Sequence, residues 1–152
     1  MARRPPKSFT RGGMTTGAVE QHLRELGDHV LEAAKAALKE GAEMVVKDAK
    51  SRCPVYEGHK KKNKKGIEQV YHWAGAKPGA LRDSIQAEPN SKGTVYAISA
   101  NAKSDDGYLY GQIVEFSPGE NNRPFLYPAL EANRQAVSDM IQDAIKNAIR
   151  RG

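Results

Sequence analysis

Cysteine, long apolar runs and the signature motifs of enzymes are scarce or missing in this sequence of 152 residues. The single cysteine, Cys53, cannot form an internal disulfide and has no CxxC partner, so we expect a small buried or half-buried side chain. The longest apolar runs are only a few residues, far short of the roughly 20 that cross a bilayer. No apolar signal-peptide core follows Arg3 and Arg4. We therefore expect a protein that stays in the cytoplasm where it is made, with no membrane partner.

Residues that could carry catalysis or bind a metal lack the spacing that such chemistry requires. His22 and His29 would share a helix face, but no carboxylate or third ligand is arranged with them as in HExxH, which favours ordinary surface or interface histidines. Cys53, His59 and His72 could converge on zinc, yet they lack ligand-pair spacing. No GxxxxGK[ST], GxGxxG or GxSxG pattern occurs. The sequence predicts no enzyme, no metal site and no cofactor.

The formal net charge of +6 is typical of nucleic-acid-binding proteins, but its location along the chain changes its meaning. Nine of the 24 basic residues lie in two short segments: Arg3, Arg4, Lys7, Arg11, Lys60, Lys61, Lys62, Lys64 and Lys65. The other 15 stand against 18 acidic residues, so the rest of the chain is mildly acidic. The lysine tract is either a solvated loop or a contact for nucleic acid, in which lysine–phosphate contacts and stacking on Trp73 would combine.

Length and composition predict one globular domain with two polar appendages. Hydrophobic residues make up 39% and charged residues 28%, which suits a soluble fold with some flexible segments. Residues 1–17 combine Pro-Pro, Gly-Gly and four positive charges without an apolar period, which predicts a flexible basic arm. Residues 18–152 form the domain, with a mobile lysine-rich insertion at about residues 57–66.

Two long helices are the clearest structural prediction. Apolar residues recur in steps of three and four from Ala18 to about Ser51, and Pro54 ends the pattern. Gly27 and Gly41 inside this helix either allow a bend or the close approach of another backbone, or are merely tolerated. A second apolar stripe runs through residues 123–152, with Pro128 in its first turn and two arginines near its end.

The residues between these helices predict a small antiparallel sheet. Leu81–Glu88 and Thr94–Ala102 alternate apolar and polar residues and flank the turn sequence PNSKG, which favours a hairpin. Tyr108–Phe116 fits either a short helix or a third strand. The order of helix, small sheet and helix indicates an α+β domain, in which the two long helices pack on one face of the sheet.

Four segments occur in a fixed order along the chain: CPVYEG, GALRDSI, YLYGQIVEF and RPFLYPALEAN. Together they resemble the neck and minor-tail proteins of long-tailed bacteriophages, a family described as head-to-tail joining or tail-completion proteins. The resemblance covers about residue 18 to the end. Its matching residues are Pro54, Val55, Gly58, Leu81, Arg82, Ser84, Ile85, Tyr110, Val114, Glu115, Phe116, Pro124, Phe125, Leu126, Pro128 and Ala129.

The sequence departs from the family pattern in two places. Phe116 is followed by Ser117 and Pro118, where the family has Gly-Thr. The lysine-rich insertion separates Gly58 from Gly79, where the family usually runs on directly. The first departure puts the local turn geometry in doubt, and the second marks a contact specific to this phage.

The resemblance implies a non-catalytic structural protein of the virion, located at the neck or at the tail end. It implies a ring on the axis through which DNA leaves, with a hexamer favoured and a dodecamer second. Neighbouring neck and tail proteins are the implied partners, together with non-specific contact with DNA in the channel. The implied assembly or motif residues are Pro54, Val55, Leu81, Arg82, Ser84, Glu115, Phe116, Pro124, Phe125, Leu126, Tyr127 and Pro128.

The residues themselves leave three questions open. Phe125 and Leu126 suit either core anchoring, which we favour, or subunit contact. Arg82 and Glu115 have opposite charges that would allow an ion pair within or between subunits. The alternative function is a basic nucleic-acid-binding module whose possible DNA or partner contacts are Arg3, Arg4, Lys60, Lys61, Lys62, Lys64, Lys65 and Trp73.

Overall fold

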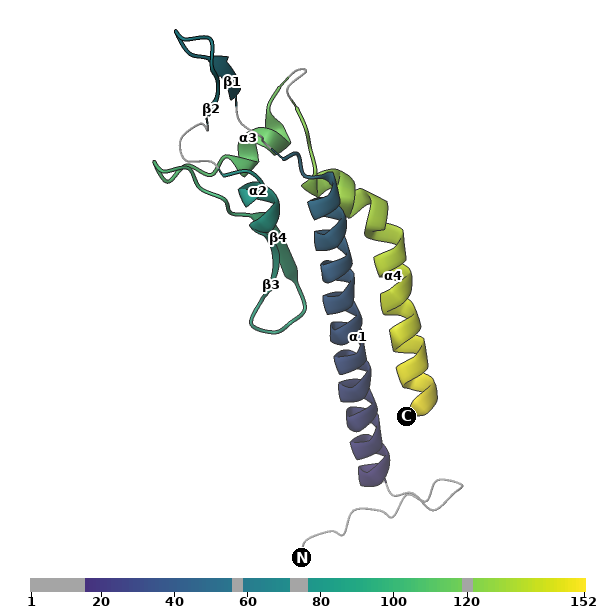
Figure 1. Ribbon diagram of the computed structural model, residues 1–152. Helices are drawn as coiled ribbons and strands as arrows, with labels where there is room; N and C mark the ends of the chain where they lie inside the picture. Colours follow the sequence, from purple (N-terminus) through teal and green to yellow (C-terminus); the bar gives the residue numbers. More distant parts are fainter. Residues whose placement is uncertain (1–15, 56–58, 72–76, 119–121) are drawn as a thin grey trace, which may run out of the picture.

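The computed structural model describes residues 16–55, 59–71, 77–118 and 122–152, and its largest feature is a pair of long helices side by side (Figure 1). α1 spans Thr16–Arg52 and α4 spans Leu126–Arg151. α1 ends there because Pro54 disfavours helical backbone at the residue before it. Both predicted helices are confirmed to within three residues at each end.

Small residues allow α1 and α4 to approach each other closely. Buried alanines line both helices: Ala37, Ala42, Ala49, Ala129 and Ala148. A Cβ atom built on Gly41 would lie 2.6 Å from Cγ1 of Val137, whereas one built on Gly27 would meet nothing within 4 Å. Gly41 is therefore a position of close approach, and Gly27 is tolerated.

A polar contact also joins the two helices. Nδ2 of Asn133 donates to Oδ2 of Asp48 at 2.7 Å and to the carbonyl oxygen of Ala129 at 2.8 Å. The hydrogen bond from Arg52 lowers the pKa of Asp48, against the opposing effect of desolvation. Asp48 is therefore held as a carboxylate, the form that accepts hydrogen bonds from both α1 and α4.

The predicted hairpin is present, as strands β3 (Ile85–Pro89) and β4 (Tyr96–Ala100). They pair antiparallel with Ile85 opposite Ala100, and both strands contact α1. Oδ1 of Asn90 closes the turn by accepting from the backbone N–H groups of Thr94 and Val95, at 2.8 and 3.2 Å.

The prediction that Leu81–Glu88 is one strand is wrong in its first half. Residues Ala80–Asp83 form the short helix α2, which follows Gly79 at φ +79°. Leu81 and Ile85 are both buried, and their spacing of four residues fits a helical turn better than alternation. For Tyr108–Phe116, left open between helix and strand, the structure has the helix α3 at Gly111–Phe116.

The lysine-rich tract, predicted as a mobile insertion, contains a second hairpin among its described residues. β1 (His59–Lys62) pairs antiparallel with β2 (Glu68–Tyr71), with Lys62 opposite Glu68. The sequence hides this hairpin because four successive polar residues carry no apolar alternation. In Figure 1 the hairpin projects from the end of the molecule where α1 ends and α4 begins.

The core lies where α1, α2, α3, α4 and the β3–β4 hairpin meet. Ile85 from β3 and Phe125 from the start of α4 are its largest fully buried side chains, and Val45, Ala49, Cys53, Leu81, Ala102 and Ala129 complete it. The fold class is therefore the predicted α+β arrangement of a long N-terminal helix, a small antiparallel sheet and a long C-terminal helix. The first turn of α4 meets the sheet in this core, and the rest of the helix runs along α1.

Candidate assembly surface

Glu115 is a buried carboxylate that holds the start of α4. Only 4% of its surface is exposed, although it lies on the short helix α3. Oε2 accepts hydrogen bonds from the backbone N–H groups of Phe125 and Leu126, at 2.8 and 3.0 Å, and Oε1 accepts from that of Tyr127 at 2.8 Å. One side chain therefore binds three consecutive backbone donors.

These three donors are the ones that α4 cannot satisfy by itself. The first four N–H groups of a helix have no partner within the helix, and the N-cap residue here, Phe125, offers no side-chain acceptor. Pro128, the next residue after the three donors, has no N–H group to satisfy. The carboxylate also lies at the positive end of the helix dipole. Glu115 and Pro128 thus complete the first turn together.

Arg82 and Glu115 do not form an ion pair with each other within the described part of the subunit. Nε of Arg82 lies 3.1 Å from Oδ1 of its neighbour Asp83, and both groups are exposed. Both carboxylate oxygens of Glu115 instead accept hydrogen bonds from backbone N–H groups, a role that the sequence pattern does not predict. The available signal was a helix start with no Ser, Thr, Asp or Asn at its N-cap, which requires an acceptor from elsewhere in the chain.

The motif residues divide into buried, partly buried and exposed residues. Leu81, Glu115 and Phe125 are buried; Pro54, Ser84, Leu126 and Pro128 are partly buried; Val55, Arg82, Phe116, Pro124 and Tyr127 are exposed. The favoured core role is right for Phe125, which is fully buried, and Leu126 packs against the same core. The buried set builds the core, and the exposed set remains available to partners.

Phe116 is the most exposed large apolar side chain in the described part of the chain. It is 76% exposed, immediately after the buried Glu115. Ile113 lies one turn earlier on α3 and is also exposed. On α4, Tyr127 and Leu130 are exposed with the same spacing of three residues. Two apolar helix faces are thus presented to solvent by segments that the Glu115 carboxylate ties together. We call these four residues the apolar surface.

The basic candidates are only partly described by the structure. Lys61, Lys62, Lys64 and Lys65 are exposed around the tip of the β1–β2 hairpin. Lys60 belongs to β1, and nothing is said of its side chain; Arg3, Arg4 and Trp73 lie outside the described residues. The structure therefore brings four of the predicted basic contacts together.

The residues considered for catalysis or zinc binding are only partly described, because nothing is said of the side chain of His59 in β1. His22 and His29 are exposed on α1, and His72 lies outside the described residues. Burial raises the pKa of the Cys53 thiol to about 11, so this group is protonated and unreactive near neutral pH. Across the ranges that the structure describes, no group of three His, Cys, Asp or Glu side chains is placed to hold a metal ion.

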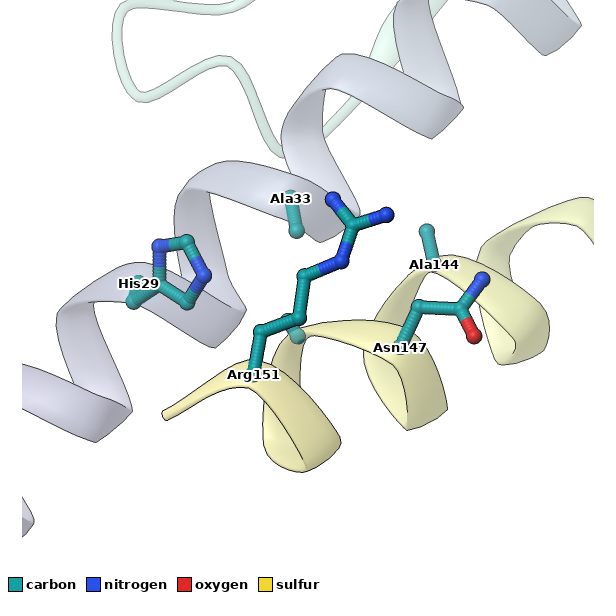
Figure 2. Close-up of a pocket in the computed structure, with 6 residues that line it drawn as sticks. His29, Ala33, Ala144, Asn147 and Arg151 are labelled. Carbon is teal, nitrogen blue, oxygen red and sulfur yellow. The ribbon is translucent and has the colours of Figure 1, made fainter.

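A shallow groove between the N-terminal half of α1 and the C-terminal end of α4 has a volume of about 260 Å³. Its walls are Ala33 from α1 and Ala144 and Ala148 from α4, with His29, Asn147 and Arg151 at its edges. Figure 2 shows the Arg151 side chain lying between the labelled residues of the two helices.

Comparison with known proteins identifies a family. A family model described as "Bacteriophage HK97-gp10, putative tail-component" matches residues 17–116, which run from the start of α1 to the end of α3. No curated protein and no solved structure gives a significant match. In the described ranges of the chain, no helix is both long and apolar enough to cross a membrane. Since the match covers about two thirds of the sequence, the chain belongs to the HK97-gp10-like family of bacteriophage tail components.

Proposed function

We propose that this protein is a structural component of the neck or tail-completion region of a tailed phage and assembles into a ring around the DNA exit axis. Closed rings arise from contacts between two different surfaces of identical subunits. A hexamer is the favoured stoichiometry and a dodecamer the second, because a phage axis imposes six- or twelvefold multiplicity on such a ring. Its partners are further copies of itself and the neighbouring neck and tail proteins, and its role is structural rather than catalytic.

The exposed Phe116 beside the buried Glu115 is the observation that carries this proposal. Aromatic side chains are frequent anchors of protein interfaces, and Phe116 is the most exposed large apolar side chain in the described part of the chain. Because Glu115 fixes the end of α3, Phe116 reaches a partner with little loss of conformational freedom. The apolar surface is therefore the proposed contact with the next subunit or the adjacent tail protein.

The test replaces Phe116 with serine and measures assembly. The F116S variant keeps the circular dichroism spectrum and unfolding midpoint of the wild type but does not form rings in native mass spectrometry or negative-stain images. V95S is the matched control, because Val95 is similarly exposed at the remote β3–β4 turn. In complementation of the phage that encodes the protein, F116S yields heads without completed tails. Normal rings and infectious virions from F116S would reject the apolar surface as the contact.

A basic nucleic-acid-binding module is the competing function, supported by the exposed lysines of the β1–β2 hairpin. The two functions differ in the affinity for DNA that they require of the free protein. A regulator has to bind DNA tightly as a free protein at physiological salt, with dissociation constants of about 10⁻⁸ M or below. A structural component does not need such affinity, so a gel-shift salt series on the isolated protein separates the two.

A further inference from the structure

The β1–β2 hairpin carries a dense group of positive charges that form no ion pair within the described residues. Lys61, Lys62, Lys64 and Lys65 lie within five consecutive positions and are all exposed. Glu68 is the one acidic residue of the sequence between residues 59 and 71. Within the described part of the chain, none of the four ammonium groups is within ion-pair distance of a carboxylate.

The tip of this hairpin is a defined turn. Oδ1 of Asn63 accepts from the backbone N–H groups of Lys65 and Ile67, at 3.0 and 2.9 Å. The backbone of Asn63 also pairs with that of Ile67, and Gly66 takes the positive φ of +77° that the turn needs. The Asn63 side chain thus accepts the hydrogen bonds of the turn, and none of the ammonium groups of Lys61, Lys62, Lys64 and Lys65 is needed to form it.

The arrangement of charge on the two faces of the ribbon distinguishes between possible partners. Successive residues of a strand point to opposite faces, so Lys61 and Lys62 lie on different faces of the hairpin, and Lys64 and Lys65 occupy the turn between the strands. A flat acidic protein surface would meet only one face. The major groove of duplex DNA admits a two-stranded ribbon and has a phosphate backbone on each side.

We propose that the β1–β2 hairpin binds the phosphate backbones of duplex DNA without reading its sequence, by entering a groove with lysines on both of its faces. This inference goes beyond the proposed structural function and does not depend on ring formation. Repulsion among the clustered ammonium groups destabilises the free hairpin, and phosphate contact removes that repulsion while releasing counterions. A single hairpin binds DNA weakly, with a dissociation constant of about 10⁻⁶–10⁻⁴ M at physiological salt, as in other sequence-independent binding.

The experiment measures binding of the full-length protein to a fluorescent mixed-sequence duplex by anisotropy, over a series of salt concentrations. The hairpin variant K61Q/K62Q/K64Q/K65Q is compared with K39Q/K47Q/K92Q/K146Q, which removes four exposed lysines from α1, the β3–β4 turn and α4. Both variants lose four charges from the formal +6 and retain the basic residues of the N-terminal segment. Circular dichroism verifies that each variant is folded.

The hairpin variant is expected to lose at least about tenfold in affinity at low salt. The slope of log affinity against log salt concentration is expected to decrease in magnitude by about 3–4, because each of the four lost phosphate contacts contributes about 0.9 to it. The control variant stays within about twofold of the wild type. Equal losses in both variants, or no binding by the wild type, would overturn the proposal. Displacement of the duplex by poly-L-glutamate at equal charge concentration would also overturn it, in favour of an acidic protein partner.

Discussion

At the scale of single residues, Glu115 shows how one side chain compensates for what a helix start lacks. Its carboxylate reaches from α3 to α4 and accepts three N–H groups that have no partner within the helix, the one of Phe125 being buried. Hydrogen bonds to a charged acceptor are about twice as strong as neutral ones. The buried charge is thus compensated by donors on both of its oxygens, although the described residues place no cation against it.

Replacing Glu115 with alanine is expected to lower the free energy of unfolding by about 2–4 kcal/mol, because three backbone donors lose their acceptor near the core. Urea unfolding followed by circular dichroism measures this change. E115Q is expected to lose less, since its amide oxygen still accepts. The control E43Q changes an exposed carboxylate of α1 and stays within about 0.5 kcal/mol of the wild type. Equal stability of E115A and E43Q would show that the cap contributes nothing.

Cys53 is expected to react slowly in the folded protein. Burial is the main cause of its high pKa. The positive charge of Arg82 lowers the pKa, and the carboxylates of Asp83 and Glu115 raise it. A rise of the thiol pKa from 9.0 to about 11 leaves roughly 100-fold less thiolate near neutral pH. Reaction with a chromogenic disulfide at pH 8 is therefore at least about 100-fold slower in native buffer than in guanidinium, and comparable rates would refute the burial.

The same pKa fixes the direction of the alkaline stability change. The unfolded thiol ionises at lower pH than the folded one, so the unfolded state binds fewer protons between about pH 9 and 11. Stability contributed by the neutral thiol is complete below pH 9 and falls as the pH rises through this window. The C53A variant has no thiol and therefore does not lose this contribution to stability. Urea unfolding midpoints of C53A and the wild type, measured at pH 8 and pH 10, give the size of the contribution.

At the scale of elements, the contact of Gly41 with Val137 sets how closely α1 and α4 pack. G41A brings a methyl group into Val137 and is expected to destabilise the protein by about 1–3 kcal/mol, despite the helix propensity of alanine. G27A has open space around the new methyl group and is expected to gain up to about 1 kcal/mol. Thermal and urea unfolding measure both changes. Trimming the contact in G41A/V137A recovers part of the loss if the clash is its cause.

The periodic elements are the part of the fold that the sequence predicts well. α1 and α4 bury one stripe each over many turns, so the three- and four-residue spacing repeats often enough to be read. α2 is too short for this, because Leu81 and Ile85 make a single helical step that also resembles alternation. In the β1–β2 hairpin, the strand residues with described side chains, Lys61, Lys62, Glu68 and Gln69, are polar and exposed, so they show no apolar alternation in the sequence.

For the candidate site, the sequence identifies which residues matter better than it identifies what each of them does. Phe125 was expected in the core and is fully buried there. Glu115 was identified as a motif residue, but its partners are backbone N–H groups on α4, and no side-chain pattern encodes backbone donors. A contact of this kind depends on the tertiary approach of α3 to α4, which the sequence does not specify locally.

At the scale of the whole molecule, the two long helices differ in length. α1 has 37 residues and α4 has 26, which correspond to roughly 55 and 40 Å at 1.5 Å per residue. Leu26 lies against the C-terminal Gly152, so the first turns of α1 extend beyond α4, as Figure 1 shows. The molecule is therefore an elongated rod, with the core, the apolar surface and the lysine hairpin all at the end opposite this extension.

The adjacency of Glu115 and Phe116 has a consequence for genetics. Neighbouring codons specify a side chain buried for folding and a side chain exposed to solvent. Random mutagenesis of this pair is expected to yield two phenotypes that do not overlap: temperature-sensitive alleles with little accumulated protein at codon 115, and alleles with normal protein levels at every temperature but non-infectious particles at codon 116. Only the second class should interfere with a co-expressed wild-type copy, since only that product remains folded well enough to enter a mixed assembly.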